Sequence, residues 1–235
     1  MAIAAGLDPA FTTATTGSGV TTAGFSPVAN SLIVAVASTD SGTGTITVVF
    51  SDSVGLSWTE ILPEQTGTGG GTVSAAWAYT TPSQSGMTVT TTWTGTGTSG
   101  GKGVKVTTFT GAHSTVPIGA SSRGTSGTNN LTVSYTNTVD GSLGMAAGTE
   151  FNALGLPTST DTEQAYHLSG AVDGISVYKA ATTSGTGGTV NLNLDAGSTG
   201  TAMWSYFVFE LLPAAAAAVS DPPRRRPQMG ALIQL

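Results

Sequence analysis

The chain has 235 residues, of which 39% are hydrophobic and only 9% are charged, so its polar surface has to come from threonine, serine, asparagine and glycine. Its formal net charge of −6 argues against a nucleic-acid groove, because phosphate binding needs clustered lysine and arginine. Cysteine is absent, which excludes disulfides, thiolate zinc sites and cysteine nucleophiles.

The chain opens with MAIAAG, which has no positive charge and no long apolar stretch, so we expect residues 1–27 to be an N-terminal segment rather than a signal peptide. Beyond it, hydrophobic residues recur with a period of two, which is typical of β-strands with one buried face. The alternating segments are, in chain order, residues 45–50, 73–79, 87–93, 104–108 and 190–194.

Two further segments are apolar on both faces. Residues 32–37 have the sequence LIVAVA, and residues 202–212 have the sequence AMWSYFVFELL. Such runs predict central strands that are covered on both sides. Ser205, Glu210 and Pro213 interrupt the second run, so no membrane span is expected. Clusters of glycine, serine and threonine separate the strands, and this spacing predicts an all-β sandwich or barrel.

The order of these strands is repeated within the chain. Residues 31–38 resemble residues 142–149, and three more pairs follow in the same order: the strand around Trp77 with residues 175–181, residues 87–94 with 189–195, and residues 103–110 with 201–209. We interpret the repeat as two halves, about residues 28–111 and 112–212, that complete one sandwich, because neither half offers enough apolar positions for its own core. Two stacked small domains are the alternative.

Five segments carry a family resemblance. They are SLIVAVAS at residues 31–38, the Asp-x-x-Gly-x-x-Trp-Thr pattern at 52–59, AAWAY at 75–79, TVTTTWTG at 88–95 and VKVTTFTGA at 104–112. Their succession resembles jelly-roll-like β-sandwich modules of tailed-phage virion proteins and some bacterial surface proteins, over residues 28–212. In such families asparagine commonly occupies the position of Leu56. The resemblance implies a jelly-roll-like β-sandwich, and the terminal MGALIQL after a Pro/Arg-rich stretch resembles the extended tails of actinobacteriophage structural proteins.

Few side chains are candidates for catalysis. The chain has two histidines, His113 and His167, and one Gly-x-Ser-x-Gly match at residues 97–101. A strand follows that match, whereas a nucleophile elbow requires a helix. Asp161 and Glu163 share one face of a strand and are candidate calcium ligands with Asp173, although acids on a solvated face are the commoner explanation. We therefore expect no enzyme, no cofactor and no metal.

Aromatic side chains provide the candidate ligand site. Trp77 and Trp93 are in phase with apolar neighbours and are expected in the core. Trp58, Trp204 and Tyr206 are the candidates for a platform on which sugar rings stack, because an aromatic face is flat and apolar. Trp204 and Tyr206 lie on the strand face opposite the phenylalanines of the same segment, so that face is expected to meet a partner or a second sheet.

Residues 213–235 form an alanine-, proline- and arginine-rich tail whose charge opposes that of the body. Residues 1–220 contain four basic and twelve acidic residues, whereas residues 221–235 contain three basic and one acidic. Its prolines favour an extended chain that cannot join a sheet interior. We expect the tail to bind an acidic, apolar partner surface, or alternatively to fold back on its own acidic body. The partner-binding candidates are Arg224, Arg225, Arg226, Met229, Leu232, Ile233 and Leu235.

These features predict a non-enzymatic structural protein of a tailed-phage virion, either a minor tail protein or a capsid-surface decoration protein, attached partly through its C-terminal tail. Its expected location is the virion, and its expected partners are other virion proteins in a homo-oligomer or multi-copy assembly. Neither nucleic acid nor membrane is an expected partner. The alternative is a carbohydrate-binding or host-adhesion β-sandwich module that binds a host glycan.

Overall fold

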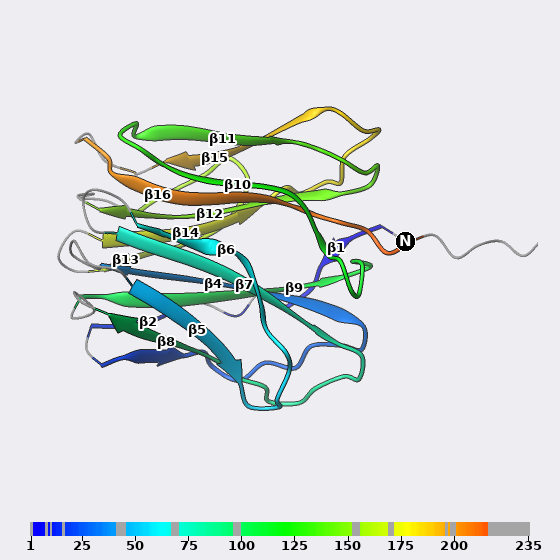
Figure 1. Cartoon of the computed structure of the whole chain (residues 1–235), viewed down its shortest axis with the longest axis horizontal. Coiled ribbons are helices and arrows are strands. Elements are labelled where there is room, and N and C mark those ends of the chain that lie inside the picture. Colours follow the sequence, from blue (N-terminus) through cyan, green and yellow to red (C-terminus); the bar gives the residue numbers. More distant parts are fainter. Residues whose placement is uncertain are drawn as a thin grey trace, which may run out of the picture.

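The computed structural model of the chain consists of β-strands and their connections (Figure 1). It describes residues 2–7, 9, 11–15, 17–40, 46–66, 71–95, 100–151, 156–168, 172–195, 197 and 201–215. Within these residues there is no helix that could cross a membrane. The predicted all-β sandwich is confirmed.

The first half of the chain forms one large and one small antiparallel sheet. In spatial order the large sheet consists of β1 (Ala4–Ala5), β9 (Lys102–Thr110), β4 (Ser31–Asp40), β7 (Gly71–Thr80) and β6 (Thr59–Thr66), and β2 (Thr12–Ala14) also pairs with β9. The small sheet consists of β3 (Gly19–Thr21), β8 (Val89–Gly95) and β5 (Ile46–Asp52). The predicted central strand at residues 32–37 lies within β4, which has a partner on each side.

The second half repeats this plan. Its large sheet consists of β10 (Ile118–Ser126), β16 (Trp204–Leu211), β12 (Leu143–Phe151), β14 (Val172–Tyr178) and β13 (Thr162–Leu168). Its small sheet pairs β11 (Asn130–Thr136) with β15 (Thr189–Asp195). The order β9-β4-β7-β6 of the first half thus corresponds to β16-β12-β14-β13, which follows the repeat seen in the sequence.

The two large sheets pack against each other and the small sheets lie outside them, so the molecule has four layers (Figure 1). This differs from the expectation that both halves complete one sandwich, because each half contributes its own pair of sheets. The physical reason is that each half also buries a cluster of its own. The middle cluster includes Leu32, Val34, Met145, Phe207 and Phe209; the first outer cluster includes Ile33, Ala35 and Trp93; the second outer cluster includes Val133, Leu192 and Trp204.

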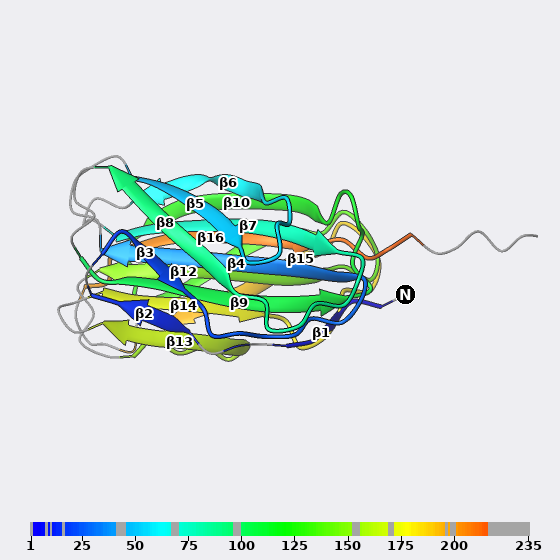
Figure 2. The same ribbon diagram turned by 90° about the horizontal axis from the view of Figure 1, so that it is seen from below.

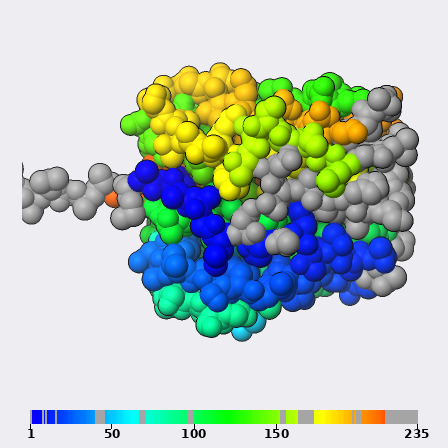
Figure 3. Space-filling model, turned by 180° about the vertical axis from the view of Figure 1, so that it is seen from behind, coloured from blue at the N-terminus to red at the C-terminus, as the bar shows by residue number. Residues whose placement is uncertain are grey.

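Both described ends of the chain lie at the same end of the stack. Ala112 forms a β-bridge with Pro213, and the N–H of Ala214 donates to the carbonyl of Gly111 at 2.7 Å. Gly111 has a φ of +73°, and a Cβ at this position would collide with the carbonyl of Ala2. The N-terminal residues, blue in Figures 2 and 3, run along β9, where β1 and β2 pair. The opposite end carries the ends of β4, β8 and β15 and the starts of β9 and β16.

A buried carboxylate lies near the end of β16. Glu210 has no exposed surface, and it accepts hydrogen bonds from the N–H of Thr138 at 2.8 Å, the hydroxyl of Thr138 at 2.6 Å and the N–H of Ala120 at 3.1 Å. Burial by itself raises the pKa of Glu210, but these hydrogen bonds outweigh it, so the pKa is lowered from its ordinary value. Because a Cβ at residue 119 would collide with Glu210 Oε2, Gly119 gives the carboxylate its room. Glu210 therefore joins β16 to β10 and to the connection after β11.

Candidate functional site

The turn after β5 fixes the position of Trp58. The carboxylate of Asp52 accepts hydrogen bonds from the N–H groups of Val54 and Gly55, both at 2.7 Å, and of Leu56 at 3.0 Å. It also accepts one from the indole N–H of Trp58 at 2.8 Å. Gly55 has a φ of +83°, a conformation that favours glycine. The Asp-x-x-Gly-x-x-Trp pattern is thus a carboxylate-centred turn that fixes an aromatic ring.

Trp58 stands beside Phe50 at a hollow of about 280 Å³. The two rings are stacked, with their centroids 5.9 Å apart and their planes inclined by 24°. The rest of the lining comes from the β5 edge between Thr47 and Phe50, from Glu60 and Glu64 of β6, and from Ala76. Because β5 is the outer strand of the small sheet and β6 that of the large sheet, the hollow lies between the edges of two layers.

Two carboxylates give the hollow its charge. Glu64 Oε1 accepts a hydrogen bond from the N–H of Val48 at 2.8 Å, so this side chain reaches across to β5. The pKa of Glu60 is raised, first by partial burial and second by the neighbouring Glu64, while Arg123 opposes the shift. Arg123, from β10 of the second half, donates to the carbonyls of Glu64, at 2.9 Å, and Pro63. An aromatic pair beside two carboxylates suits a ligand with an apolar surface and either positive charge or hydroxyl donors.

The other two residues of the predicted platform lie elsewhere. Trp204 has no exposed surface, and a Cβ at Gly148 would lie 3.0 Å from its ring, so its side chain is enclosed in the second outer cluster. Tyr206 is partly buried against the same cluster and covers Gly124 of β10. The second sheet expected on this face is present and is formed by β11 and β15. The structure therefore does not bring Trp58 together with Trp204 and Tyr206.

The histidines and acids singled out in the sequence lie outside the hollow. His113 Nδ1 accepts the N–H groups of Thr115 and Val116 at 3.3 and 3.1 Å, which is a turn contact. His167 lies opposite Asp173 in the register of β13 and β14, and Asp173 is fully buried. The side chains of His167 and Glu163 fall outside the described part of the chain. Within that part, no group of three or more histidine and acidic side chains could hold a metal ion.

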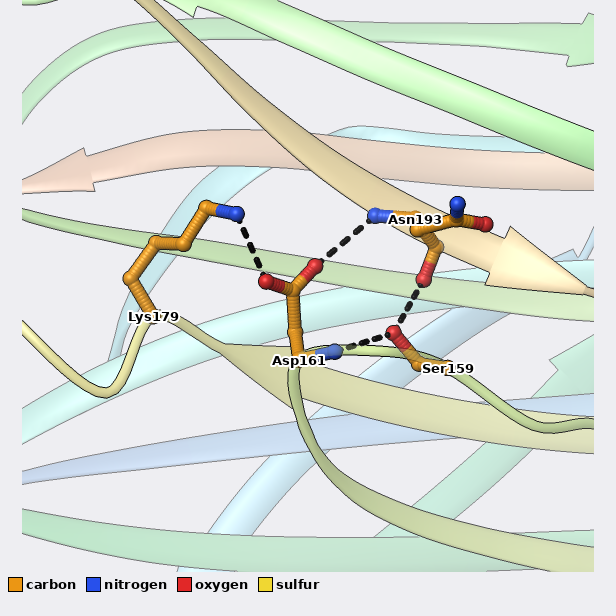
Figure 4. A network of polar contacts seen from close by, with 4 residues as sticks. All are labelled: Ser159, Asp161, Lys179 and Asn193. Carbon is orange, nitrogen blue, oxygen red and sulfur yellow. Dashed lines mark hydrogen bonds and ion pairs between the residues drawn. The ribbon is translucent and has the colours of Figure 1, made fainter.

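Asp161, the remaining candidate calcium ligand, belongs to a polar network at the edge of β15 (Figure 4). Its carboxylate pairs with Lys179 Nζ at 2.6 Å and accepts the N–H of Asn193 at 2.9 Å. The hydroxyl of Ser159 donates to the carbonyl of Asn193 at 2.6 Å and accepts the N–H of Asp161 at 3.0 Å. Both carboxylate oxygens of Asp161 are thus engaged by protein groups, and the network covers the strand edge.

Sequence reasoning found Trp58 but missed Phe50, Glu60 and Glu64. The alternation over residues 45–50 predicts a strand with one buried face, but nothing in the sequence shows that this strand, which carries Phe50, is an outer one. The spacing of Glu60, Pro63 and Glu64 within TEILPEQT was the available signal, since charges and proline are typical of edge strands. The seven tail candidates, from Arg224 to Leu235, lie outside the described residues.

Searches of family models, curated proteins and solved structures find no match to the chain. Function therefore has to be inferred from the residues of the hollow, from the position of the two ends of the body and from the charge of the tail.

Proposed function

We propose that the protein is a non-enzymatic structural component of a tailed-phage virion, either a minor tail protein or a capsid-surface decoration protein, present in multiple copies and attached partly through its C-terminal tail. The motif succession over residues 28–212 supports the family, and it is an argument from resemblance. The four-layer β-stack supports a scaffold role, since its buried clusters hold the large sheets together and leave the outer faces to uncharged threonine, serine and asparagine.

The position of the ends is the observation that carries the proposal. Pro213 and Ala214 are held by Ala112 and Gly111, so the tail starts from a fixed point. The N-terminal strand β1 pairs with the end of β9 at the same place. If the protein is attached through residues 216–235, two surfaces would face outward. One is the hollow, on the side of the first half, and the other is the opposite end of the stack.

Deleting residues 221–235 tests the attachment. We expect the truncated protein to unfold at the same temperature as the full chain, because the described contacts of the body end at residue 215, and to be lost from purified particles. Copy number per particle, measured by quantitative mass spectrometry, is the readout. A substitution of residues 224–226 by serine is the matched control that removes only the charge. Normal copy number of the truncated protein would show that the tail is not an anchor.

A second candidate function is carbohydrate binding, which the stacked pair of Phe50 and Trp58 beside two carboxylates favours. We expect Trp58→Ala to abolish binding to cell-wall glycans on an array, whereas Trp58→Phe, which keeps an aromatic face and loses the bond to Asp52, retains most of it. Equal binding by all three proteins would exclude the hollow as the glycan site.

A further inference from the structure

The outer edge of β5 is less protected than that of β6. Edge strands usually carry charges, prolines or bulges that prevent another strand from pairing with them. β6 has all three, in Glu60, Pro63 and two shifts of register against β7. By contrast, β5 has the sequence ITVVFSD, pairs only with β8 among the described strands, and exposes 53% of Val49.

Hydrogen-bonding groups of β5 point out of the sheet along this edge. In an antiparallel strand, alternate residues direct their N–H and C=O groups to the same side. Because the N–H of Val48 donates to Glu64 rather than to β8, those of Ile46 and Phe50 also point away from β8. Glu64 occupies the middle position of this row, so an added strand has to displace its carboxylate from the N–H of Val48.

Among the described strands, the second half has no counterpart of β5. There, Thr158 forms a β-bridge with Asp195, and the side chains of Ser159 and Asp161 bind the backbone of Asn193 in β15 (Figure 4). In the first half, β5 takes the place of this network beside β8, and its own outer edge borders the hollow. The outer edge of β5 is thus an additional strand edge of the first half.

The chemistry of the hollow favours a cationic, extended peptide. Glu60 and Glu64 offer negative charge, and Phe50 and Trp58 offer an apolar surface. The indole N–H of Trp58 already donates to Asp52, so it provides no polar contact for a sugar hydroxyl. The outward N–H and C=O groups of the β5 edge can pair with a peptide backbone, and their spacing is not specific to a sugar.

The chain itself contains a segment with these properties. Residues 224–226 are three arginines, and after Pro227 the sequence QMGALIQL has no proline and no charge, so it can pair as a strand. The four basic residues of the body are already engaged. Lys102 and Lys105 are buried and bind backbone carbonyls, Arg123 binds the backbone of β6, and Lys179 pairs with Asp161.

We propose that the hollow binds the C-terminal segment of this chain, with residues 228–235 added as an antiparallel strand to the free edge of β5. Residues 224–226 then precede this strand at the Asp52 end of β5, which is the end nearer to Glu60. β5 runs toward the end of the molecule from which the tail starts, so an antiparallel strand enters from that end. The inference rests on the proposed function, in which the tail attaches the protein. It names the surface that the tail binds, which is the β5 edge of a copy of this chain.

Engineered cysteines in the full chain test the docking, since the natural sequence has none. One variant combines Val49→Cys with Leu232→Cys. The matched control combines Val116→Cys with Leu232→Cys; Val116 is 57% exposed and lies beside Pro117, whose carbonyl accepts the N–H of Leu212, so it is nearer the start of the tail. We expect the disulfide at Val49→Cys to form about tenfold faster under a glutathione buffer, because docking raises the effective concentration.

Charge dependence provides the second readout. Glu60→Lys and 1 M salt are both expected to remove most of the difference in cross-linking rate between the Val49→Cys and Val116→Cys variants. Asp140→Lys, the same charge change in the second half, is expected to leave this difference unchanged. A cyclised monomer and a linked dimer both support the proposal and show whether the tail docks on its own copy or on another. Equal rates at Val49→Cys and Val116→Cys would overturn it. The proposal would also be overturned if Glu60→Lys left the cross-linking rate unchanged and Trp58→Ala abolished glycan binding.

The docking and the attachment can fail separately. If the cross-link forms but the protein lacking residues 221–235 still enters particles, the docking stands and the attachment does not. If deletion blocks incorporation but the cross-link shows no preference for β5, the tail attaches to another surface and the docking is rejected.

Discussion

Replacing Glu210 by alanine is expected to lower the free energy of unfolding by about 2–3 kcal/mol at pH 7, since it removes the acceptor of several hydrogen bonds at once. The N–H groups of Ala120 and Thr138 would lose the charged carboxylate that accepts their hydrogen bonds. Thr138 and Val139 are exposed and can turn to water, which keeps the cost below that of a deeply buried pair. Urea unfolding followed by tryptophan fluorescence measures the difference.

The same substitution predicts a pH dependence. Because the pKa of Glu210 is lowered in the folded protein, its contribution is complete above the ordinary glutamate pKa of about 4.3 and is lost as the pH falls through the lowered value. The difference in stability between the natural protein and Glu210→Ala is therefore expected to be constant from pH 6 to 8 and to shrink in strongly acidic buffer.

Glu60→Ala is the matched control, because Glu60 is an exposed carboxylate on β6 with no comparable set of donors. We expect it to change the free energy of unfolding by less than about 0.5 kcal/mol. An equally small effect for Glu210→Ala, or a difference that grows toward acid pH, would contradict the role assigned to the buried carboxylate.

The inner strands were predictable because their side chains alternate or are apolar throughout. LIVAVA at residues 32–37 lies within β4, whose alternate residues enter two different clusters, as its composition requires. The repeat was equally visible, since β4 and β12 occupy equivalent places in the two large sheets. Two edge strands of the large sheets, β6 and β10, were not predictable. β10, with the sequence IGASSRGTS, and β6, with TEILPEQT, have no alternation. β10 is held by β16, which is far away in the sequence, and β6 is an irregular edge strand with two shifts of register against β7.

Polar residues inside apolar segments were the least predictable. Glu210 looked like an interruption of the run AMWSYFVFELL, yet it is buried, because Thr138 and Ala120 approach it from segments far away in the chain. Trp204 belongs to the same run, and whether its face meets solvent or a sheet depends on where β11 and β15 pack. The hollow beside Trp58 likewise arises from the meeting of two strand edges, which no local pattern describes.

Four layers in one chain raise the question of whether the halves unfold together. The middle cluster contains residues of both large sheets, including Leu32 and Val34 from the first half and Met145, Phe207 and Phe209 from the second. Arg123 adds a contact between β10 and β6. Since the apolar faces of both large sheets would be exposed if either half opened alone, we infer a single cooperative unit.

Replacing Phe209 by alanine is accordingly expected to cost about 3–5 kcal/mol, as for other buried aromatic residues, and to leave one unfolding transition. Hydrogen exchange is the decisive measurement: amides of β4 and β7 should lose protection together with those of β12 and β16, although Phe209 belongs to the second half. Trp93→Ala, which removes a fully buried ring from the first outer cluster, is the matched variant and should have the same global effect. Loss of protection confined to the half that carries the substitution would mean that the halves are separate domains and that the middle cluster is only a contact between them.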